Sequence, residues 1–287
     1  MIRPLPECQV TIVGLGLMGG SLAGALRNQC RAVIGVARRT ETVEAALERG
    51  LIDRGTTNLP EGVQSADMVV LATPVRTILR QLPEIGPFLP QDCVLMDLGS
   101  TKTQILAEMD HLPNHVQPLG GHPMCGKELA GIEAADPTLY QGRTFILCPL
   151  PRTSPEALAL GRALAKAVGS HPLVLEPERQ DFLVATLSHL PYLLACALVS
   201  TADATTSSDP AAWEIIAGGF RDTSRVAGSD VTMMLDILLT NREEILRAVR
   251  TYQLHLDRLA ELLEAGHEDD LHRLLSLIRQ KRKEMFP

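Results

Sequence analysis

The chain has 287 residues, 45% of them hydrophobic, and a formal net charge of −7. This length fits two domains, and the hydrophobic fraction is ample for packed cores. The negative charge argues against nucleic acid or an anionic membrane as a main partner.

The cysteines and the apolar stretches exclude further classes of protein. Six cysteines lie far apart with no C-x-x-C pair, so neither a disulfide framework nor a zinc site is indicated, and we expect no bound metal. Residues 1–9 lack the apolar core of a signal peptide. The most apolar stretch, 190–199, is too short to span a bilayer and contains Pro191. We therefore expect a cytoplasmic protein.

The first predicted element is a strand at 10–13 that ends in glycines spaced G-x-G-x-x-G, followed by a helical pattern. Gly14 permits a sharp turn, Gly16 lets a diphosphate approach the backbone, and Gly19 lets the helix lie close to the sheet. An ordinary tight turn could share this spacing, but a second strand at 32–37 completes a βαβ unit. The residues predicted to contact the dinucleotide here are Gly14, Gly16, Leu17, Met18 and Gly19.

The end of the second strand indicates which dinucleotide binds. A carboxylate at this place would bind the ribose of NAD, but the chain has Arg38 and Arg39 there and no acid before Glu41. Guanidinium groups can bind a 2′-phosphate through paired hydrogen bonds. The two arginines could instead be a solvated charge pair, since exposed arginine is common. Their position in the unit favours NADP as the cofactor.

The following apolar runs predict more strands of the same sheet. Because the runs are continuous rather than alternating, both faces of each strand should be covered, which is typical of a parallel sheet. Ligands of such sheets bind beyond the carboxyl ends of the strands, where Thr73, Pro74 and Ser100 fall. We predict that these three residues lie at the cofactor. The further strands are expected at 66–73, 93–97, 116–119, 144–148 and 172–175.

Beyond about residue 176 the pattern is helical, at 180–200 and again at 242–286, with no strand signal. Pro191 predicts a kink beside His189, because proline removes a helical hydrogen bond. The sequence therefore predicts a Rossmann-type NADP-binding α/β domain at 1–175. It is followed by an all-α substrate and dimerisation domain at 176–287.

The last helical stretch carries a candidate interface. Between Ile245 and Leu263 apolar residues recur at alternating spacings of four and three, which is a heptad seam. Such a seam could pair with a second copy of the chain or seal the core of its own domain. We expect a homodimer.

Three polar segments are candidates for chemistry. His122 stands in the glycine-rich sequence G-G-H-P-M, which predicts a loop, and an ordinary histidine pKa suits a general base. A surface histidine in a flexible turn would look the same. His189 lies beside the expected kink but could be an ordinary buried histidine. Arg221, Asp222 and Arg225 follow a glycine pair and could equally form a surface ion pair in a loop between helices.

Taken together, these segments resemble the prephenate/arogenate dehydrogenases of tyrosine biosynthesis, and most closely the cyanobacterial-type arogenate dehydrogenases. The likeness covers nearly the whole chain. It implies hydride transfer to the nicotinamide from the ring carbon that bears the hydroxyl, with loss of the ring carboxylate as CO2 and aromatisation. The blocks that carry it are G-L-G-L-M-G at 14–19, Asp97 with Ser100 and Lys102, G-G-H-P-M at 120–124, S-H-L-P at 188–191 and G-F-R-D-T-S-R at 219–225.

The resemblance also implies roles for particular residues. His122 would accept a hydrogen bond from the substrate hydroxyl and take its proton, and Ser100 would orient this histidine and the nicotinamide. His189 and Arg225 would bind the substrate, where a cation suits its two carboxylates. Arg221 is the next candidate for this clamp.

The choice between arogenate and prephenate depends on one functional group of the substrate. Arogenate carries an ammonium where prephenate has a ketone, so its selection needs a nearby anion, and candidates are Glu128, Asp222 and Asp230. Asp222 could instead pair with a neighbouring arginine. Tyr192, Lys127 and the region of Met234 depart from common family patterns and leave the preference open. We expect arogenate, with prephenate, which would give 4-hydroxyphenylpyruvate, as the alternative.

Two other hypotheses about the function fit the sequence less well. A β-hydroxyacid dehydrogenase has a similar opening motif and an all-α second domain, but that family uses a lysine near the start of the second domain. No lysine occurs between Glu176 and Asp203. A non-catalytic NADP-binding sensor would not need His122, Ser100 and Arg225 together.

Overall fold

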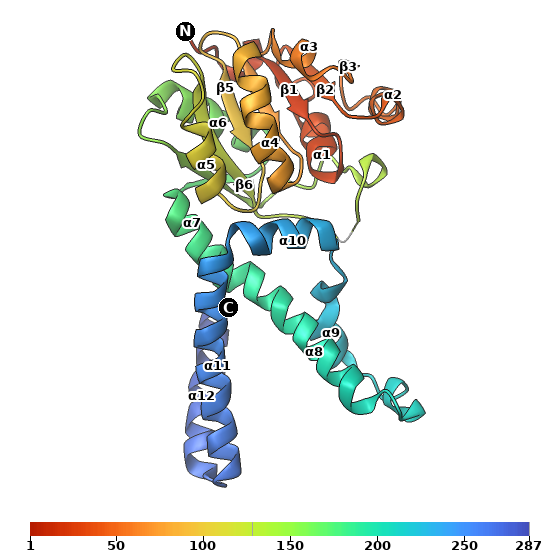
Figure 1. Cartoon of the computed structure of the whole chain (residues 1–287), viewed down its shortest axis with the longest axis vertical. Helices are drawn as coiled ribbons and strands as arrows, with labels where there is room; N and C mark the ends of the chain where they lie inside the picture. Colours follow the sequence, from red (N-terminus) through yellow and green to blue (C-terminus); the bar gives the residue numbers. More distant parts are fainter. Residues whose placement is uncertain (128, 287) are drawn as a thin grey trace. The chain divides into compact units, whose positions relative to one another are not determined.

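The computed structural model describes residues 1–127 and 129–286 (Figure 1). The chain divides into two compact units, Met1–Arg242 and Glu243–Pro287. All strands of the described residues lie before residue 175 and only helices follow 176, so secondary structure changes where the sequence predicts. The first compact unit extends to 242 because α7 (Pro177–Val184) and α10 (Val231–Thr240) make contacts with the α/β region.

The described part of the first unit contains an eight-stranded sheet in the order β3-β2-β1-β4-β5-β6-β7-β8. Neighbouring strands are parallel except β6 and β7, which run antiparallel. The prediction of a purely parallel sheet is therefore wrong at this pair, because continuous apolar runs report burial on both faces and not strand direction. The strands are β1 (Gln9–Val13), β2 (Ala32–Val36), β3 (Arg54–Thr56), β4 (Met68–Leu71), β5 (Val94–Asp97), β6 (Gln117–Pro123), β7 (Thr144–Pro149) and β8 (His171–Val174).

Helices cover both faces of this sheet. Successive strand residues point to opposite faces, so Met68 and Val70 of β4 join one apolar cluster and Val69 and Leu71 join the other. The first cluster includes residues of α1, α2 and α6, and the second includes residues of α3, α4 and α5. These helices are α1 (Leu17–Leu26), α2 (Thr40–Glu48), α3 (Leu59–Val63), α4 (Val75–Ile85), α5 (Thr103–Met109) and α6 (Pro155–Ala167), with 3-10 turns at Leu5–Glu7, Gly86–Phe88 and Ile132–Ala134.

A long helix follows the sheet. It consists of α7 (Pro177–Val184), a π-helical segment (Ala185–His189) and α8 (Leu190–Thr206). The break predicted at Pro191 takes this form: a wider turn ends just before the proline, which cannot donate to a regular helical hydrogen bond.

This continuity corrects one expectation. The helix of 30 residues is long and apolar enough to cross a membrane, so stretch length alone does not exclude a span. The 190–199 stretch looks short only because the preceding turns carry polar residues. One such helix is weak evidence for a membrane span, and this helix brings buried Gln180, Asp181 and His189 to the α/β region.

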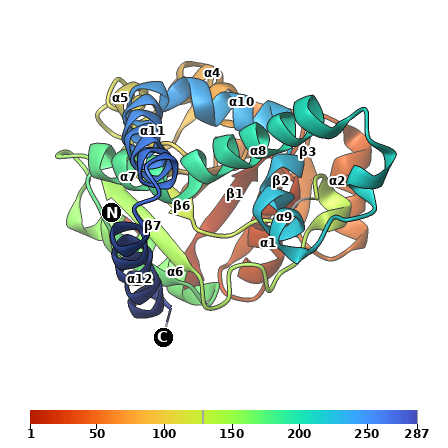
Figure 2. The same ribbon diagram turned by 90° about the horizontal axis from the view of Figure 1, so that it is seen from below.

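Shorter helices complete the first unit: a 3-10 turn at Pro210–Trp213, α9 (Gly218–Ser224), a 3-10 turn at Arg225–Gly228 and α10 (Val231–Thr240). The segment at 218–225 is thus helical and not a loop between helices, and it packs against α8. Figures 1 and 2 show α7, α8 and α10 beside the edge of the sheet at which the strands β1, β4 and β5 end.

The second unit contains α11 (Arg242–Glu264) and α12 (Glu268–Met285). The single pattern expected over 242–286 is broken at Gly266, whose φ of +64° lies in the left-handed region that favours glycine. Along the predicted seam, Leu256 and Leu263 are 51% and 71% exposed. These two seam residues are therefore exposed in the single chain, while Leu259 between them is half-buried.

Candidate active site

The glycine-rich turn between β1 and α1 has the geometry of a dinucleotide cradle. Gly14 has a φ of +99°, and a Cβ on Gly19 would lie 1.8 Å from the Gly14 carbonyl oxygen. A Cβ on Gly16 would have nothing within 4 Å, so open space lies in front of the helix N-terminus. Backbone N–H groups and the positive end of the helix dipole face that space. These residues fit the diphosphate of a dinucleotide.

The neighbouring residues frame this cradle. Leu17 is buried at the start of α1, and the carbonyl of half-buried Met18 accepts a hydrogen bond from Tyr140 at 2.8 Å. Thr73 lies after β4 and donates to Gln81 at 2.7 Å, while Pro74 directly precedes α4. Both lie beyond the carboxyl end of β4, as predicted.

Arg38 and Arg39 lie just beyond the end of β2, and both are exposed. Within residues 1–127 and 129–286, neither guanidinium makes an ion pair or hydrogen bond. Two cations that have no partner among the described residues thus lie beyond the end of β2, and this arrangement suits an anionic ligand.

A buried ion pair lies at the carboxyl end of β5. Lys102 and Asp97 are each 0% exposed, and the Lys102 ammonium donates to Asp97 and, at 2.8 Å, to the carbonyl of Gly121. The Asp97 carboxylate also accepts the N–H of Gly99 at 2.7 Å. A Cβ on Gly121 would lie 2.5 Å from the Asp97 carbonyl oxygen, so only glycine permits this approach.

This packing corrects the predicted position of His122. The glycines before it do not form a loop: β6 runs through them to Pro123, and His122 pairs with Ile146 of β7. The glycines instead make room for the Asp97–Lys102 pair. His122 is consequently a rigid strand residue, 8% exposed.

His122 is held through its Nδ1 atom, which lies 2.7 Å from Oε1 of Gln180. Burial, together with the nearby Lys102 ammonium, lowers the pKa of His122 to about 4, although the Gln180 hydrogen bond opposes this shift. The imidazole is therefore neutral at pH 7 and able to accept a proton. Ser100 is half-buried in the loop after β5, and the role expected for it toward His122 stays a prediction.

Gln180 and Asp181, in the first turns of α7, connect the site to the sheet. Nε2 of Gln180 donates to Oδ1 of Asp181 at 2.7 Å and approaches the carbonyl of Ser100 at 3.5 Å. The Asp181 carboxylate also accepts the N–H groups of Lys102 at 2.7 Å and Thr103 at 2.9 Å, at the N-terminus of α5. Sequence analysis missed both residues; the only signal was two polar side chains shortly after Pro177.

His189 is 1% exposed, and its Nε2 atom has no hydrogen-bond partner within the described chain. Its Nδ1 lies 3.3 Å from Nδ2 of Asn241, which also donates to the Asp181 carbonyl at 2.8 Å. Burial lowers the pKa of His189 to about 4, opposed by Asp181. His189 is thus neutral at pH 7, which corrects the expectation of a cation at this position: burial disfavours the charged ring.

Arg221, Asp222 and Arg225 are exposed on α9 and the following turn, which pack on α8. Asp230 accepts the N–H of Met233 at 2.7 Å and so caps α10. Glu128 lies outside the described residues.

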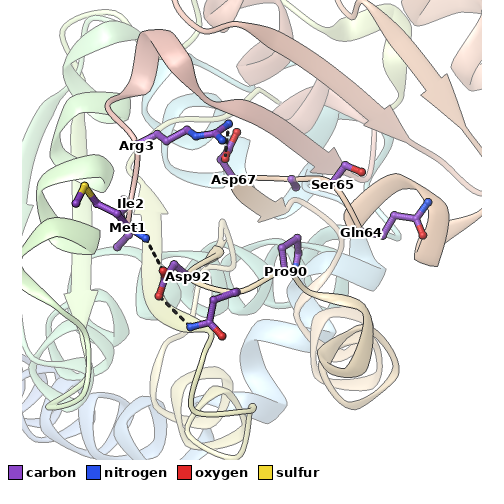
Figure 3. A pocket seen from close by; sticks show the side chains of 10 residues that line it. Met1, Ile2, Arg3, Gln64, Ser65, Asp67, Pro90 and Asp92 are labelled. Carbon is purple, nitrogen blue, oxygen red and sulfur yellow. Dashed lines mark hydrogen bonds and ion pairs between the residues drawn. The ribbon is translucent and has the colours of Figure 1, made fainter.

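A hollow of about 190 Å³ lies at the opposite, amino edge of the sheet (Figure 3). Its charged groups pair with each other: Arg3 with Asp67 at 3.3 Å and the N-terminal amine of Met1 with Asp92 at 2.5 Å. Across the described parts of the chain, no three His, Cys, Asp or Glu side chains could hold a metal ion. The charged groups that line the hollow are therefore already paired with one another.

Comparisons with known proteins agree on one family. The model of the prephenate dehydrogenase nucleotide-binding domain matches residues 22–174, and that of the prephenate dehydrogenase dimerization domain matches 176–277. The prephenate dehydrogenase of Bacillus subtilis is 32% identical over 277 residues, covering 95% of this chain and 75% of that protein.

Two solved structures are similar over almost all of the chain. The prephenate dehydrogenase of A. aeolicus, in complex with hydroxyphenyl propionate and NAD+, has a TM-score of 0.91 and 32% identity over 99% of this chain and 100% of that one. Synechocystis arogenate dehydrogenase has a TM-score of 0.85 and 33% identity over 96% of this chain and 99% of that one.

Proposed function

The chain belongs to the prephenate dehydrogenase family, and we propose that it oxidatively decarboxylates L-arogenate to L-tyrosine with NADP as hydride acceptor. The observation that carries this proposal is His122, a buried neutral imidazole near the end of β6. This end of β6 lies at the same edge of the sheet as the glycine-rich turn proposed to hold the dinucleotide. A neutral base at this edge is what removal of a hydroxyl proton requires.

His122 has a defined task in the proposed reaction. A bound nicotinamide would supply the acceptor for the hydride that leaves the ring carbon bearing the hydroxyl. His122 takes the hydroxyl proton, so that carbon becomes a carbonyl. The bond between the ring and its carboxylate then breaks, CO2 leaves, and the electron pair makes the ring aromatic with a phenolate oxygen. The proton on His122 returns to that oxygen, which balances the reaction.

NADP is proposed over NAD because of the end of β2. The guanidinium groups of Arg38 and Arg39 are exposed and have no partner among the described residues, and no carboxylate occurs between the end of β2 at Val36 and Glu41. The family includes an enzyme solved with NAD+, so the preference is a property of this chain's own residues. Two charge-assisted hydrogen bonds to a phosphate would favour NADP by about 10-fold or more.

Arogenate is proposed as the preferred substrate, with Synechocystis arogenate dehydrogenase among the similar structures. Prephenate is the second candidate, because the A. aeolicus and B. subtilis proteins carry that name. An anion for the arogenate ammonium must come from a group not otherwise engaged. Asp230 is engaged as the cap of α10, so Asp222 is the first residue to replace. Glu128 lies outside the described residues and stays a candidate on the sequence alone.

The test is a four-way measurement of kcat/KM with arogenate or prephenate and with NADP or NAD. We expect the highest value for arogenate with NADP. Replacing Asp222 or Glu128 by its amide should shift the ratio toward prephenate for at least one of them. Faster turnover of prephenate by the unaltered protein would overturn the substrate choice, and absence of turnover with all four pairs would overturn the function.

We also propose that the active form is a cytoplasmic homodimer with no nucleic acid or membrane as partner. The exposed leucines of α11, among them Leu256 and Leu263, would be covered by a second copy. Size-exclusion chromatography with light scattering should give twice the 31.1 kDa of one chain. A stable monomer at micromolar concentration would contradict this proposal.

A further inference from the structure

Two buried histidines at the carboxyl edge of the sheet are each held through Nδ1, but by opposite kinds of atom. His122 faces an amide oxygen, whereas His189 faces an amide nitrogen. A neutral imidazole carries one ring proton, so the partner of Nδ1 decides whether Nε2 is a donor or an acceptor. Which amide atom faces each ring is fixed by other contacts.

The orientation of the Gln180 amide is set by Asp181 and Ser100. Its nitrogen must face the Asp181 carboxylate, 2.7 Å away, and the Ser100 carbonyl, because both of these groups only accept hydrogen bonds. Its oxygen is thereby turned to His122, and a 2.7 Å contact with an acceptor requires the proton on Nδ1. Nε2 of His122 is left as an acceptor.

The orientation of the Asn241 amide is set by the main-chain carbonyl of Asp181, the residue whose carboxylate orients Gln180. Its nitrogen donates to the Asp181 carbonyl at 2.8 Å, and the second hydrogen of that nitrogen points to Nδ1 of His189 at 3.3 Å. Nδ1 of His189 must then be unprotonated, and the proton lies on Nε2. This is the buried Nε2 atom that has no partner in the described chain.

We propose that Asp181 is a positioning residue that sets the two histidines in opposite tautomers, His122 through Gln180 and His189 through Asn241. The substrate then meets one acceptor and one donor. Nε2 of His122 accepts from its hydroxyl, and the Nε2–H of His189 donates to one of its oxygen atoms. An unpaired buried donor is costly, and an oxygen ligand would remove that cost.

Asp181 is suited to this task because it is itself immobilised. It is 2% exposed, and its carboxylate accepts two N–H groups at the N-terminus of α5 as well as the Gln180 amide. Only the kinetic consequences of this inference rest on the proposed function. The tautomers themselves exist without substrate and can be measured without turnover.

The first experiment is nuclear magnetic resonance of the full chain with ¹⁵N-labelled histidine rings, whose nitrogen shifts report which ring atom carries the proton. His122→Asn and His189→Asn assign the signals. We expect Nδ1–H for His122 and Nε2–H for His189 at pH 7. The same tautomer on both rings, or the reverse pair, would overturn the inference whether or not the protein turns over either substrate.

The second experiment separates the two histidines by kinetics. In Gln180→Met the new side chain is similar in size but offers no acceptor to Nδ1 of His122. The kcat should therefore fall by at least about 10-fold. The upper limit is the roughly 10⁴-fold loss that follows when a catalytic base is held in the wrong tautomer. Asn241→Asp offers an acceptor where the parent has a donor, so the His189 proton should move to Nδ1 and KM should rise.

A merely structural role would move kcat and KM alike in both variants, and that result would overturn the inference. Gln64→Met is the matched control, because Gln64 is exposed at the amino edge of the sheet (Figure 3). Its kinetics and histidine spectra should equal those of the parent. Thermal unfolding of each variant shows that the compared proteins are folded.

Discussion

The two edges of one sheet differ in how their polar groups are satisfied. At the amino edge, Arg3, Asp67 and Asp92 line a hollow, but each charge is paired with a charge of the same edge (Figure 3). At the carboxyl edge, the described residues offer no partner to the buried Nε2 atom of His189 and none to the guanidinium groups beyond β2.

This difference shows that a hollow alone does not identify a site. Groups that already satisfy one another gain little from a ligand, whereas a buried unsatisfied donor and a neutral buried base gain a partner when a substrate binds. The parallel strands direct their carboxyl ends, and the loops that follow them, to one edge only. Changes at that edge should therefore alter activity, and changes at the amino edge should not.

The largest effect is expected for His122→Asn. The asparagine amide keeps a polar side chain at this position of β6, but it cannot take the hydroxyl proton of the substrate. The kcat should therefore fall by about 10²–10⁴. NADP affinity, measured by fluorescence or calorimetry, should remain near that of the parent. An unaltered kcat would remove His122 from the reaction.

The next effect is expected for Arg38→Asp. A carboxylate beyond β2 would repel the 2′-phosphate and could bind the ribose of NAD, so the ratio of kcat/KM with NADP to that with NAD should fall by about 10–10²-fold. Arg162→Asp, an exposed arginine on α6, is the control for the change of charge. If the NADP preference of the Arg38 variant equals that of the control, the phosphate site lies elsewhere.

Arg225→Ala should act mainly on substrate affinity. A carboxylate clamp binds the ground state as well as the transition state, so KM should rise by about 10-fold while kcat changes little. Steady-state kinetics with saturating cofactor measure both constants. An unchanged KM would move the clamp to another cation, and Arg221→Ala would be examined next.

The buried histidines should also make folding sensitive to acid. Both have a pKa of about 4 in the folded chain, against an ordinary value of 6.5. Between these values the unfolded chain binds more protons, so the free energy of unfolding should decrease as the pH falls from 6.5 toward 4. The Tm of the parent should drop between pH 7 and pH 5 by more than that of the double variant His122→Asn/His189→Asn. Equal drops would mean that the folded rings titrate normally.

The smallest effect is expected at the amino edge. The Arg3–Asp67 pair spans 3.3 Å with side chains that are 51% and 21% exposed. Solvent weakens such a pair, so Arg3→Ala should cost at most about 1 kcal/mol of stability and leave kcat and KM unchanged. A loss of activity comparable to that of a carboxyl-edge variant would break the contrast between the two edges.

The sequence predicts the structure well where a local pattern is compatible with only one backbone conformation. The G-x-G-x-x-G turn is such a pattern, and Gly14, Gly16 and Gly19 have the conformation and surroundings it predicts. Apolar runs likewise located the strands other than β3 (Arg54–Thr56), which the sequence analysis missed because R-G-T contains no apolar run. The family resemblance that rested on separated motifs is confirmed. Apolar runs could not give the direction of β7, because burial is the same for parallel and antiparallel neighbours.

The sequence was misleading where distant residues decide the structure. The glycines before His122 suggested a loop, yet they extend β6 because Asp97 and Lys102 occupy the space that side chains would fill. Gln180 and Asn241 could not be found, because they contact the histidines only after α7 and α10 reach the sheet. The neutral state of His189 likewise follows from burial, which a single helical pattern does not reveal.

The most direct test of the carboxyl-edge site is a crystal structure of the full chain with NADP and tyrosine, the proposed product. We predict the diphosphate at the turn of Gly14 to Gly19 and the phenol oxygen within hydrogen-bond distance of Nε2 of His122. A phenol bound away from His122, or a dinucleotide outside the glycine turn, would contradict the account.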